Sequence, residues 1–312
     1  MSAGDVSLTP GASSYFSAPE TRLDPNLFGP NERMRASVRT QITTTLYSFW
    51  RGRLSSPESW SALYLAGSGA SYQWSADRSD GDGRPGDLDV LIAVDWVRFY
   101  MHQTDPWTRS SPEEWAEAIN ADLHAELWPR TANTVIGGHF YELTYYVNAA
   151  TGPIQAILPY AAYDITSDTW TVRPDRHPVH PQNRADYAAV HDDYIAAQDL
   201  IARYDAAHEK VLAVHRRTPA HDANLLNAQT ELSVVVRDAK ALLDDIHGAR
   251  NTAFSEHGEG YASNENFRWQ FAKQNGVINA LQVMTALGSL PPAISGLVDT
   301  DVLIKRAMRG RE

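Results

Sequence analysis

The stretch Leu63–Asp95, LYLAGSGASYQWSADRSDGDGRPGDLDVLIAVD, contains two apolar runs separated by a polar, Gly-rich segment. The first apolar run ends at Gly67-Ser68, and the second begins directly after Asp87-Leu88-Asp89. Alternate residues of a β-strand point to the same face. The pattern therefore predicts two neighbouring strands, with Asp87 and Asp89 on one face of the second strand and Leu88 on the opposite, buried face.

Two carboxylates on one strand face lie about 6–7 Å apart along the strand and repel each other unless a cation binds between them. Hard divalent cations, Mg²⁺ above all, prefer such oxygen ligands. The Gly67-Ser68 turn at the end of the other strand offers backbone N–H groups and a hydroxyl, which are suitable partners for a phosphate. The segment thus predicts a site for metal-assisted chemistry on a nucleoside triphosphate.

Gly67-Ser68 followed by Asp87-Leu88-Asp89 resembles the signature of the polymerase-β-like nucleotidyltransferase superfamily, over residues 60–170. The resemblance implies that Ser68, with the backbone of Gly67 and Gly69, contacts the terminal phosphates. It also implies that Asp87 and Asp89 hold two Mg²⁺ ions, which align the triphosphate with an acceptor hydroxyl. In this chain eighteen residues separate Ser68 from Asp87, a longer spacer than is usual in the family. The excess is the loop 77–86, either a tolerated surface insertion or part of substrate recognition.

A two-metal site usually takes a third carboxylate from an adjacent strand, and the sequence offers two candidates. Glu142 lies within the strand-like run Thr134–Asn148, and Asp164 lies near the end of the run Ile154–Ile165. We favour Glu142 because its run is the longer, although the family usually has aspartate at this place. Either acid could instead pair with a nearby Arg or His.

Triphosphate binding also needs positive charge. The resemblance implies that cations from a helical half often close over the nucleotide, and Lys240, Arg250 and Lys273 are the candidates. Each of them could equally be a solvated surface charge, which is the commoner state of Lys and Arg.

The periodicity predicts an α+β fold, a nucleotidyltransferase-like mixed sheet with flanking helices followed by a C-terminal helical domain. Residues 1–30 read as an irregular N-terminal arm, 31–175 as the catalytic domain and 184–312 as the helical domain, after a Pro-rich linker. Ser111-Pro112-Glu113-Glu114 is typical of a helix start. Helices are expected over four C-terminal stretches: 184–216, 220–247, 264–287 and 295–308.

Composition narrows the class of partner. The chain has 312 residues, a net charge of −11 and no cysteine, which excludes disulfides and thiolate metal sites. Its N-terminal residues lack the basic-then-apolar layout of a signal peptide, and no apolar run approaches a membrane span, so a cytoplasmic protein without a membrane partner is expected. The acidic balance disfavours an RNA acceptor relative to a small molecule or a protein hydroxyl.

Two functions are consistent with these patterns. The first is a Mg²⁺-dependent nucleotidyltransferase, which moves a nucleoside monophosphate from an NTP such as ATP to an acceptor hydroxyl and releases pyrophosphate. The second is a nucleotide-binding or protein-interaction module that keeps the same fold without turnover. If Asp87, Asp89 and either Glu142 or Asp164 do not converge within metal-bridging range in the fold, the second function is the better interpretation.

Overall fold

The structure is a computed structural model, and two units are distinguished by their internal contacts. The first unit comprises the chain up to Val179 together with Phe254–Ala262, and the second comprises His180–Ala253 and the chain from Ser263 onward. The structure describes residues 20–74, 86–103, 111–149, 153–176, 184–215, 223–255 and 257–288. Most of the loop 77–86, the greater part of the linker and the predicted helix 295–308 lie outside the described residues.

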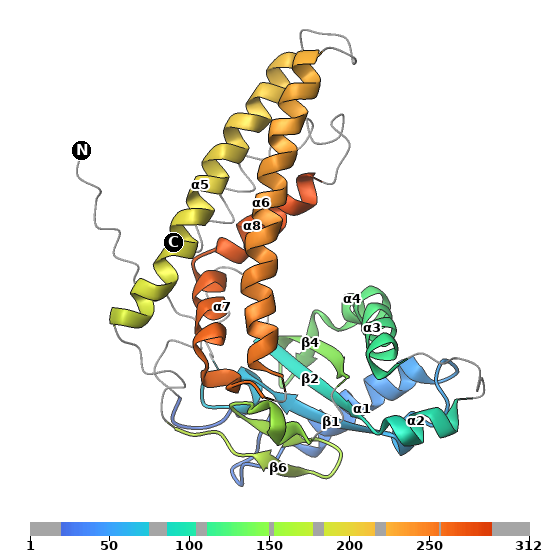
Figure 1. The fold of residues 1–312 in the computed structure, drawn as a ribbon. Helices are drawn as coiled ribbons and strands as arrows, with labels where there is room; N and C mark the ends of the chain where they lie inside the picture. Colours follow the sequence, from blue (N-terminus) through green and yellow to red (C-terminus); the bar gives the residue numbers. More distant parts are fainter. Residues whose placement is uncertain are drawn as a thin grey trace. The chain divides into compact units, whose positions relative to one another are not determined.

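The first unit is built on a six-stranded mixed sheet with flanking helices, and the C-terminal part of the chain is helical, so the fold is α+β (Figure 1). The spatial order of the strands is β3-β4-β2-β1-β5-β6. The strands are β1 (Ser61–Ala66), β2 (Gly86–Val94), β3 (Thr134–Ile136), β4 (His139–Asn148), β5 (Ala162–Asp164) and β6 (Thr169–Val172). The pair β1–β2 is antiparallel, whereas β2 and β4 are parallel and are joined through helices.

One face of the sheet is covered by helices and forms the main hydrophobic core. The helical elements of this unit include α1 (Ala36–Trp50), η1 (Pro57–Ser59), α2 (Trp96–His102), α3 (Pro112–Asp122), η3 (Leu123–Leu127), α4 (Trp128–Thr131) and η5 (Gly260–Ala262). Ile42 and Leu46 of α1 are fully buried against Leu63 of β1 and Val90 of β2. The helical spacing seen in residues 31–50 therefore marks a helix packed on the sheet, as expected.

Two helix starts follow directly from the sequence. At the predicted start of α3, the Ser111 hydroxyl accepts from the Glu114 N–H and the Glu114 carboxylate accepts from the Ser111 N–H. This reciprocal capping satisfies two backbone donors that the first helical turn leaves without partners. Asp95 caps α2 in the same sense by accepting from the Arg98 N–H.

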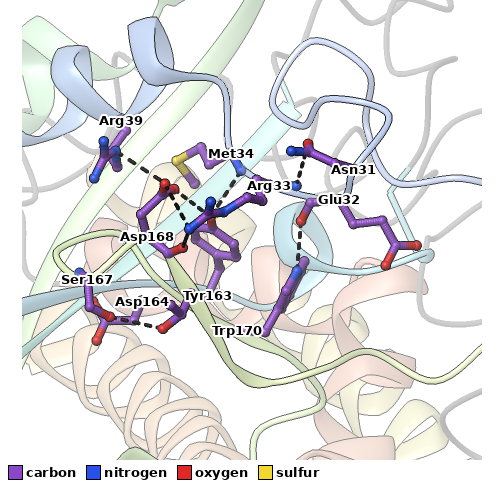
Figure 2. Close-up of polar contacts among 11 residues, drawn as sticks. Asn31, Glu32, Arg33, Met34, Arg39, Tyr163, Asp164, Ser167, Asp168 and Trp170 are labelled. Atoms are coloured by element: carbon purple, nitrogen blue, oxygen red, sulfur yellow. Dashed lines mark hydrogen bonds and ion pairs between the residues drawn. The ribbon is translucent and has the colours of Figure 1, made fainter.

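Residues 20–35 have an irregular backbone and contribute side chains to the core. Leu27 and Phe28 are buried, and the Tyr163 hydroxyl accepts from the Met34 N–H. Figure 2 shows that Tyr163 also donates to Asp168, at which Arg33 points as well. The predicted boundary at residue 30 therefore divides a segment that packs as one piece.

Two strand predictions are wrong in detail, and the backbone explains both. The run Thr134–Asn148 is a hairpin, β3 and β4, because Gly137 and Gly138 have φ values of +60° and +88°. Two consecutive residues with positive φ make a tight hairpin turn, for which Gly-Gly is well suited. The run Ile154–Ile165 begins as a helical turn, η4 (Ile154–Ile157), and only its end is strand β5. Pro153 and Pro159 lack the N–H group that a continuous strand needs here.

The second unit is entirely helical in its described residues. It comprises α5 (Arg184–His215), α6 (Ala223–Ala253), α7 (Asn264–Gln274) and α8 (Val277–Gly288). The single helix predicted over residues 264–287 is thus two helices, because Gly276 takes a φ of +74° directly after Asn275. Asn-Gly at a helix end allows the left-handed conformation that terminates the helix.

Among the described helices, none combines the length and the apolar character needed to cross a membrane.

A partly buried ion network joins three helices of the second unit. The Arg268 guanidinium donates to both Asp193 oxygens, at 2.5 and 2.8 Å, and to Asp245 at 2.7 Å. The Asp193 side chain is only 16% exposed, so the Arg268 guanidinium replaces much of the water that would otherwise surround the carboxylate.

Arg268→Ala is expected to lower the free energy of unfolding of the helical unit by about 2 kcal/mol, because it leaves a largely buried carboxylate unpaired. Arg237→Ala is the matched control, since Arg237 is 74% exposed and its ion pair with Asp238 is worth little. Urea unfolding followed by circular dichroism measures both, and equal losses would contradict the prediction.

Candidate functional site

The Asp-Leu-Asp motif lies on β2 as the alternation predicts. Leu88 and Val90 are buried in the helix-covered core, while Asp87 and Asp89 are half-buried on the opposite face of the sheet. We call this face, which carries Asp87 and Asp89, the acid face. The next residue of β2 on the acid face is Leu91, which packs against Ile154 of η4. The acids therefore lie just beyond the apolar part of the face.

The register of the sheet places Glu142 beside the motif. In the parallel pair β2–β4, Asp87 is the register partner of Glu142, and Asp89 is the partner of Thr144. Neighbouring strands are about 4.8 Å apart, and register partners point to the same face. Asp87, Asp89 and Glu142 thus share one face of two adjacent strands, with the Thr144 hydroxyl next to them.

The alternative third acid, Asp164, lies elsewhere on the sheet. It pairs with Tyr64 of β1, which in turn pairs with Leu91, so Asp164 is two strands away from β2. This spacing is about 10 Å across the sheet. The Asp164 carboxylate accepts from the Ser167 N–H at 2.8 Å and so stabilises the β5–β6 turn (Figure 2). Of the two candidates, the fold brings only Glu142 next to Asp87.

Glu142 has a specific partner that the sequence did not reveal. The indole N–H of Trp128 on α4 donates to one Glu142 oxygen at 2.8 Å, and the His124 ring stacks on Trp128 at 5.4 Å. The contact joins residues fourteen positions apart on different elements. No local pattern around Trp128 indicates it, because the partner is chosen by the packing of α4 against β4.

Gly67 and Gly69 lie directly against the motif. A Cβ atom at Gly67 would come 3.3 Å from an Asp89 carboxylate oxygen, and the Gly67 φ of +69° suits glycine. A Cβ atom at Gly69 would lie 2.6 Å from the Leu88 side chain and 3.4 Å from the Asp87 carbonyl oxygen. The two glycines therefore let the Ser68 backbone pass close to Asp87 and Asp89.

Hydrogen bonds from the residues that follow Ser68 stabilise the loop that carries it. The loop continues as a short helical turn, η2 (Ser68–Ala70), whose end is stabilised because Ser71 donates from its N–H and its hydroxyl to the Ser68 carbonyl. Tyr72 further along donates to Glu32, and Arg176 lies over the Tyr72 ring at 4.8 Å. Ser68 itself is half-buried next to the acid face.

Asp87, Asp89 and Glu142 offer three carboxylates on the same face of the adjacent strands β2 and β4. Carboxylate oxygens are the ligands that a hard divalent cation prefers. Within the described residues neither Asp87 nor Glu142 forms an ion pair with a basic side chain. Among the residues that the structure describes, no group of three His, Asp or Glu side chains is placed so that it could hold a metal ion. One Glu142 oxygen is engaged by Trp128, so completing the set requires the other oxygen.

The three predicted phosphate-binding cations belong to the second unit. Lys240 forms an ion pair with Asp244 on the same helix at 2.7 Å, and the Arg250 guanidinium lies over the Trp269 ring at 5.2 Å. Lys273 is exposed in the last turn of α7. Their role at the nucleotide stays a prediction.

His139, another polar residue near the third acid, is exposed at the start of β4. An odd separation of three residues from Glu142 sends the two side chains to opposite faces of the strand.

Comparison of the chain with protein-family models, with curated proteins and with solved structures gave no significant match.

Proposed function

We propose that the protein is a Mg²⁺-dependent nucleotidyltransferase, with its active site on the acid face of the sheet. The observation that carries the proposal is the register of β2 and β4, which makes Glu142 the direct neighbour of Asp87. This is the relation that the resemblance to the polymerase-β-like superfamily requires of a third acid. The close approach of Gly67 to Asp89 adds a phosphate-binding backbone at the same place.

In this proposal Asp87, Asp89 and Glu142 would hold the two Mg²⁺ ions. Such ions neutralise the triphosphate and activate an acceptor hydroxyl for in-line attack. Ser68 and the N–H groups around it bind the terminal phosphates, and the two glycines keep that backbone near the acids. The acceptor oxygen would bond to the α-phosphorus and release its proton to solvent water. The bond between the α-phosphorus and the oxygen that bridges to the β-phosphate would break, and pyrophosphate would leave.

The net charge of the protein bears on which class of acceptor it uses. With 27 basic against 38 acidic residues, the chain lacks the excess of Lys and Arg that non-specific nucleic-acid binding usually needs. A small molecule or a protein hydroxyl is therefore favoured over RNA.

The test is transfer of label from α-labelled NTPs, each base in turn with Mg²⁺, into a host-cell lysate that is then separated into RNA, protein and small molecules. Label that depends on the protein and on Mg²⁺ supports transfer, and the labelled fraction gives the acceptor class. Absence of label in every fraction, from protein shown to be folded, would contradict the proposal.

Trp128→Phe is expected to raise the Mg²⁺ concentration needed for half-maximal transfer by about tenfold, because the lost N–H no longer orients Glu142. Trp170→Phe is the matched control: it also deletes an indole N–H donor, the one that bonds the Glu32 carbonyl at 2.7 Å (Figure 2). Titration of Mg²⁺ against initial rate measures both. An equal shift in the two variants would contradict the orienting role.

The alternative function is a nucleotide-binding module without turnover. Two observations favour it: within the described residues Asp87, Asp89 and Glu142 do not converge as a group that could hold a metal ion, and one Glu142 oxygen accepts from the Trp128 indole. A carboxylate held by an indole is less available to a cation. In that case nucleotide binds, measured by calorimetry with ATP and Mg²⁺, but no label is transferred to any acceptor.

A further inference from the structure

A series of buried hydrogen bonds connects the Gly67-Ser68 loop to residues that follow it in the sequence. Ser71 is fully buried, and it donates to the Ser68 carbonyl from its N–H at 3.0 Å and from its hydroxyl at 3.1 Å. The Gln73 N–H donates to the Ser71 hydroxyl at 3.0 Å, and Gln73 is 1% exposed. The Ser68 carbonyl is therefore held by groups that have no access to water as an alternative partner.

Gln73 extends this series to Tyr160. The Gln73 side chain forms a hydrogen bond with the Tyr160 hydroxyl, which itself donates to the Asp175 carbonyl. A tyrosine hydroxyl is protonated at neutral pH, and burial raises the pKa of Tyr160 further, so this hydroxyl can act as a donor. Tyr160 thus connects the loop side of the network to the residues that follow β6.

The last member of this series of contacts is the segment Phe254–Ala262, which lies between α6 and α7 in the sequence and belongs to the first unit. The Tyr261 ring stacks on the Tyr160 ring with 5.6 Å between centroids and 22° between planes. The Tyr261 N–H donates to the Leu158 carbonyl at 3.1 Å. At Gly260 a Cβ atom would lie 2.2 Å from the same carbonyl oxygen, so the two backbones are in direct contact.

We propose that Tyr261 is a positioning residue for the phosphate-binding loop and acts through Tyr160, Gln73 and Ser71 on the Ser68 backbone. The proposal rests on the proposed function for the identity of the ligand, the triphosphate of an NTP. A loop that is already ordered loses less conformational entropy when the triphosphate binds. The residue therefore affects nucleotide binding although nothing places it at the reacting atoms.

The test combines a structural and a kinetic measurement on the full chain. In Tyr261→Ala, amide exchange of the peptide that covers Gly67–Gln73 is expected to be about tenfold faster than in the wild type. The KM for the NTP is expected to rise about fivefold, with kcat unchanged within about twofold. Tyr261→Phe keeps the stacked ring and should behave as the wild type. Glu259→Gln changes an exposed residue of the same segment and is the control.

Tyr160→Phe provides a second route, because it keeps the ring stack and removes only the hydroxyl that Gln73 contacts. It should give the same faster exchange over Gly67–Gln73. Unchanged exchange there in both variants would overturn the proposal, as would exchange that rises equally across the first unit. Faster exchange with an unchanged KM would overturn the link to the nucleotide. If wild-type protein transfers no label, the proposed function fails, and the exchange data alone still decide whether Tyr261 positions the loop.

Discussion

Asp87→Asn and Asp89→Asn are each expected to lower nucleotidyl transfer by at least about a thousandfold while the protein stays folded. Asparagine has nearly the same shape as aspartate but carries no charge, so it binds Mg²⁺ much more weakly than aspartate does. The fold should tolerate the change, because both acids are half-buried on one face and repel each other and Glu142. Removing one negative charge relieves that repulsion.

The measurement is the initial rate of label transfer at saturating NTP and Mg²⁺, with the thermal midpoint recorded for the same samples. Asp95→Asn is the matched control, because Asp95 directly follows β2 and caps α2 by accepting from Arg98. Asparagine is an equally good helix cap, so this variant should keep both full activity and stability. Turnover retained in the Asp87 or Asp89 variant would refute the two-metal assignment.

Gly260→Ala is expected to lower the free energy of unfolding of the first unit by about 3 kcal/mol. The new methyl group would lie 2.2 Å from the Leu158 carbonyl oxygen and 2.5 Å from the Leu158 Cβ, and the φ of +73° adds strain for any residue with a Cβ. Leu158 itself has a positive φ of +45°, so it has little freedom to move away. The segment Phe254–Ala262 would be pushed off the residues on which it packs.

Gly52→Ala and Gly138→Ala are controls that separate the steric clash with Leu158 from the backbone strain of a positive φ. Both glycines have a positive φ, +81° and +88°, but no atom lies within 4 Å of a Cβ built there. Each substitution should therefore cost about 1 kcal/mol, the price of the left-handed backbone alone. Thermal unfolding by circular dichroism compares the three, and a Gly260→Ala protein as stable as the controls would contradict the close backbone contact.

Local sequence patterns predicted the central elements because the physics behind them is local. Alternation along β2 put Leu88 in the core and Asp87 on the opposite face, since side chains of a strand have a period of two. Ser111 and Glu114 predicted the start of α3 because they satisfy its first N–H groups themselves. These features need no partner from a distant part of the chain.

Three element boundaries were wrong although local signals for them were present. Gly137-Gly138 turns one predicted strand into a hairpin, Asn275-Gly276 divides one predicted helix, and Pro153 precedes a helical turn where a strand was expected. In each case Gly or Pro sets the backbone conformation directly. Giving these residues more weight than the apolar pattern would have placed the boundaries.

The sequence by itself determined that this protein has an Asp-Leu-Asp strand next to a Gly-Ser turn, within an α+β fold that continues into helices. It did not decide between Glu142 and Asp164, because that choice depends on which strand pairs with β2 and in which register. The partner strand lies more than forty residues beyond the motif, and pairing over that distance is set by how the helices between the strands pack on the sheet. For the same reason only the tertiary structure revealed Trp128 beside Glu142 and Tyr261 against Tyr160.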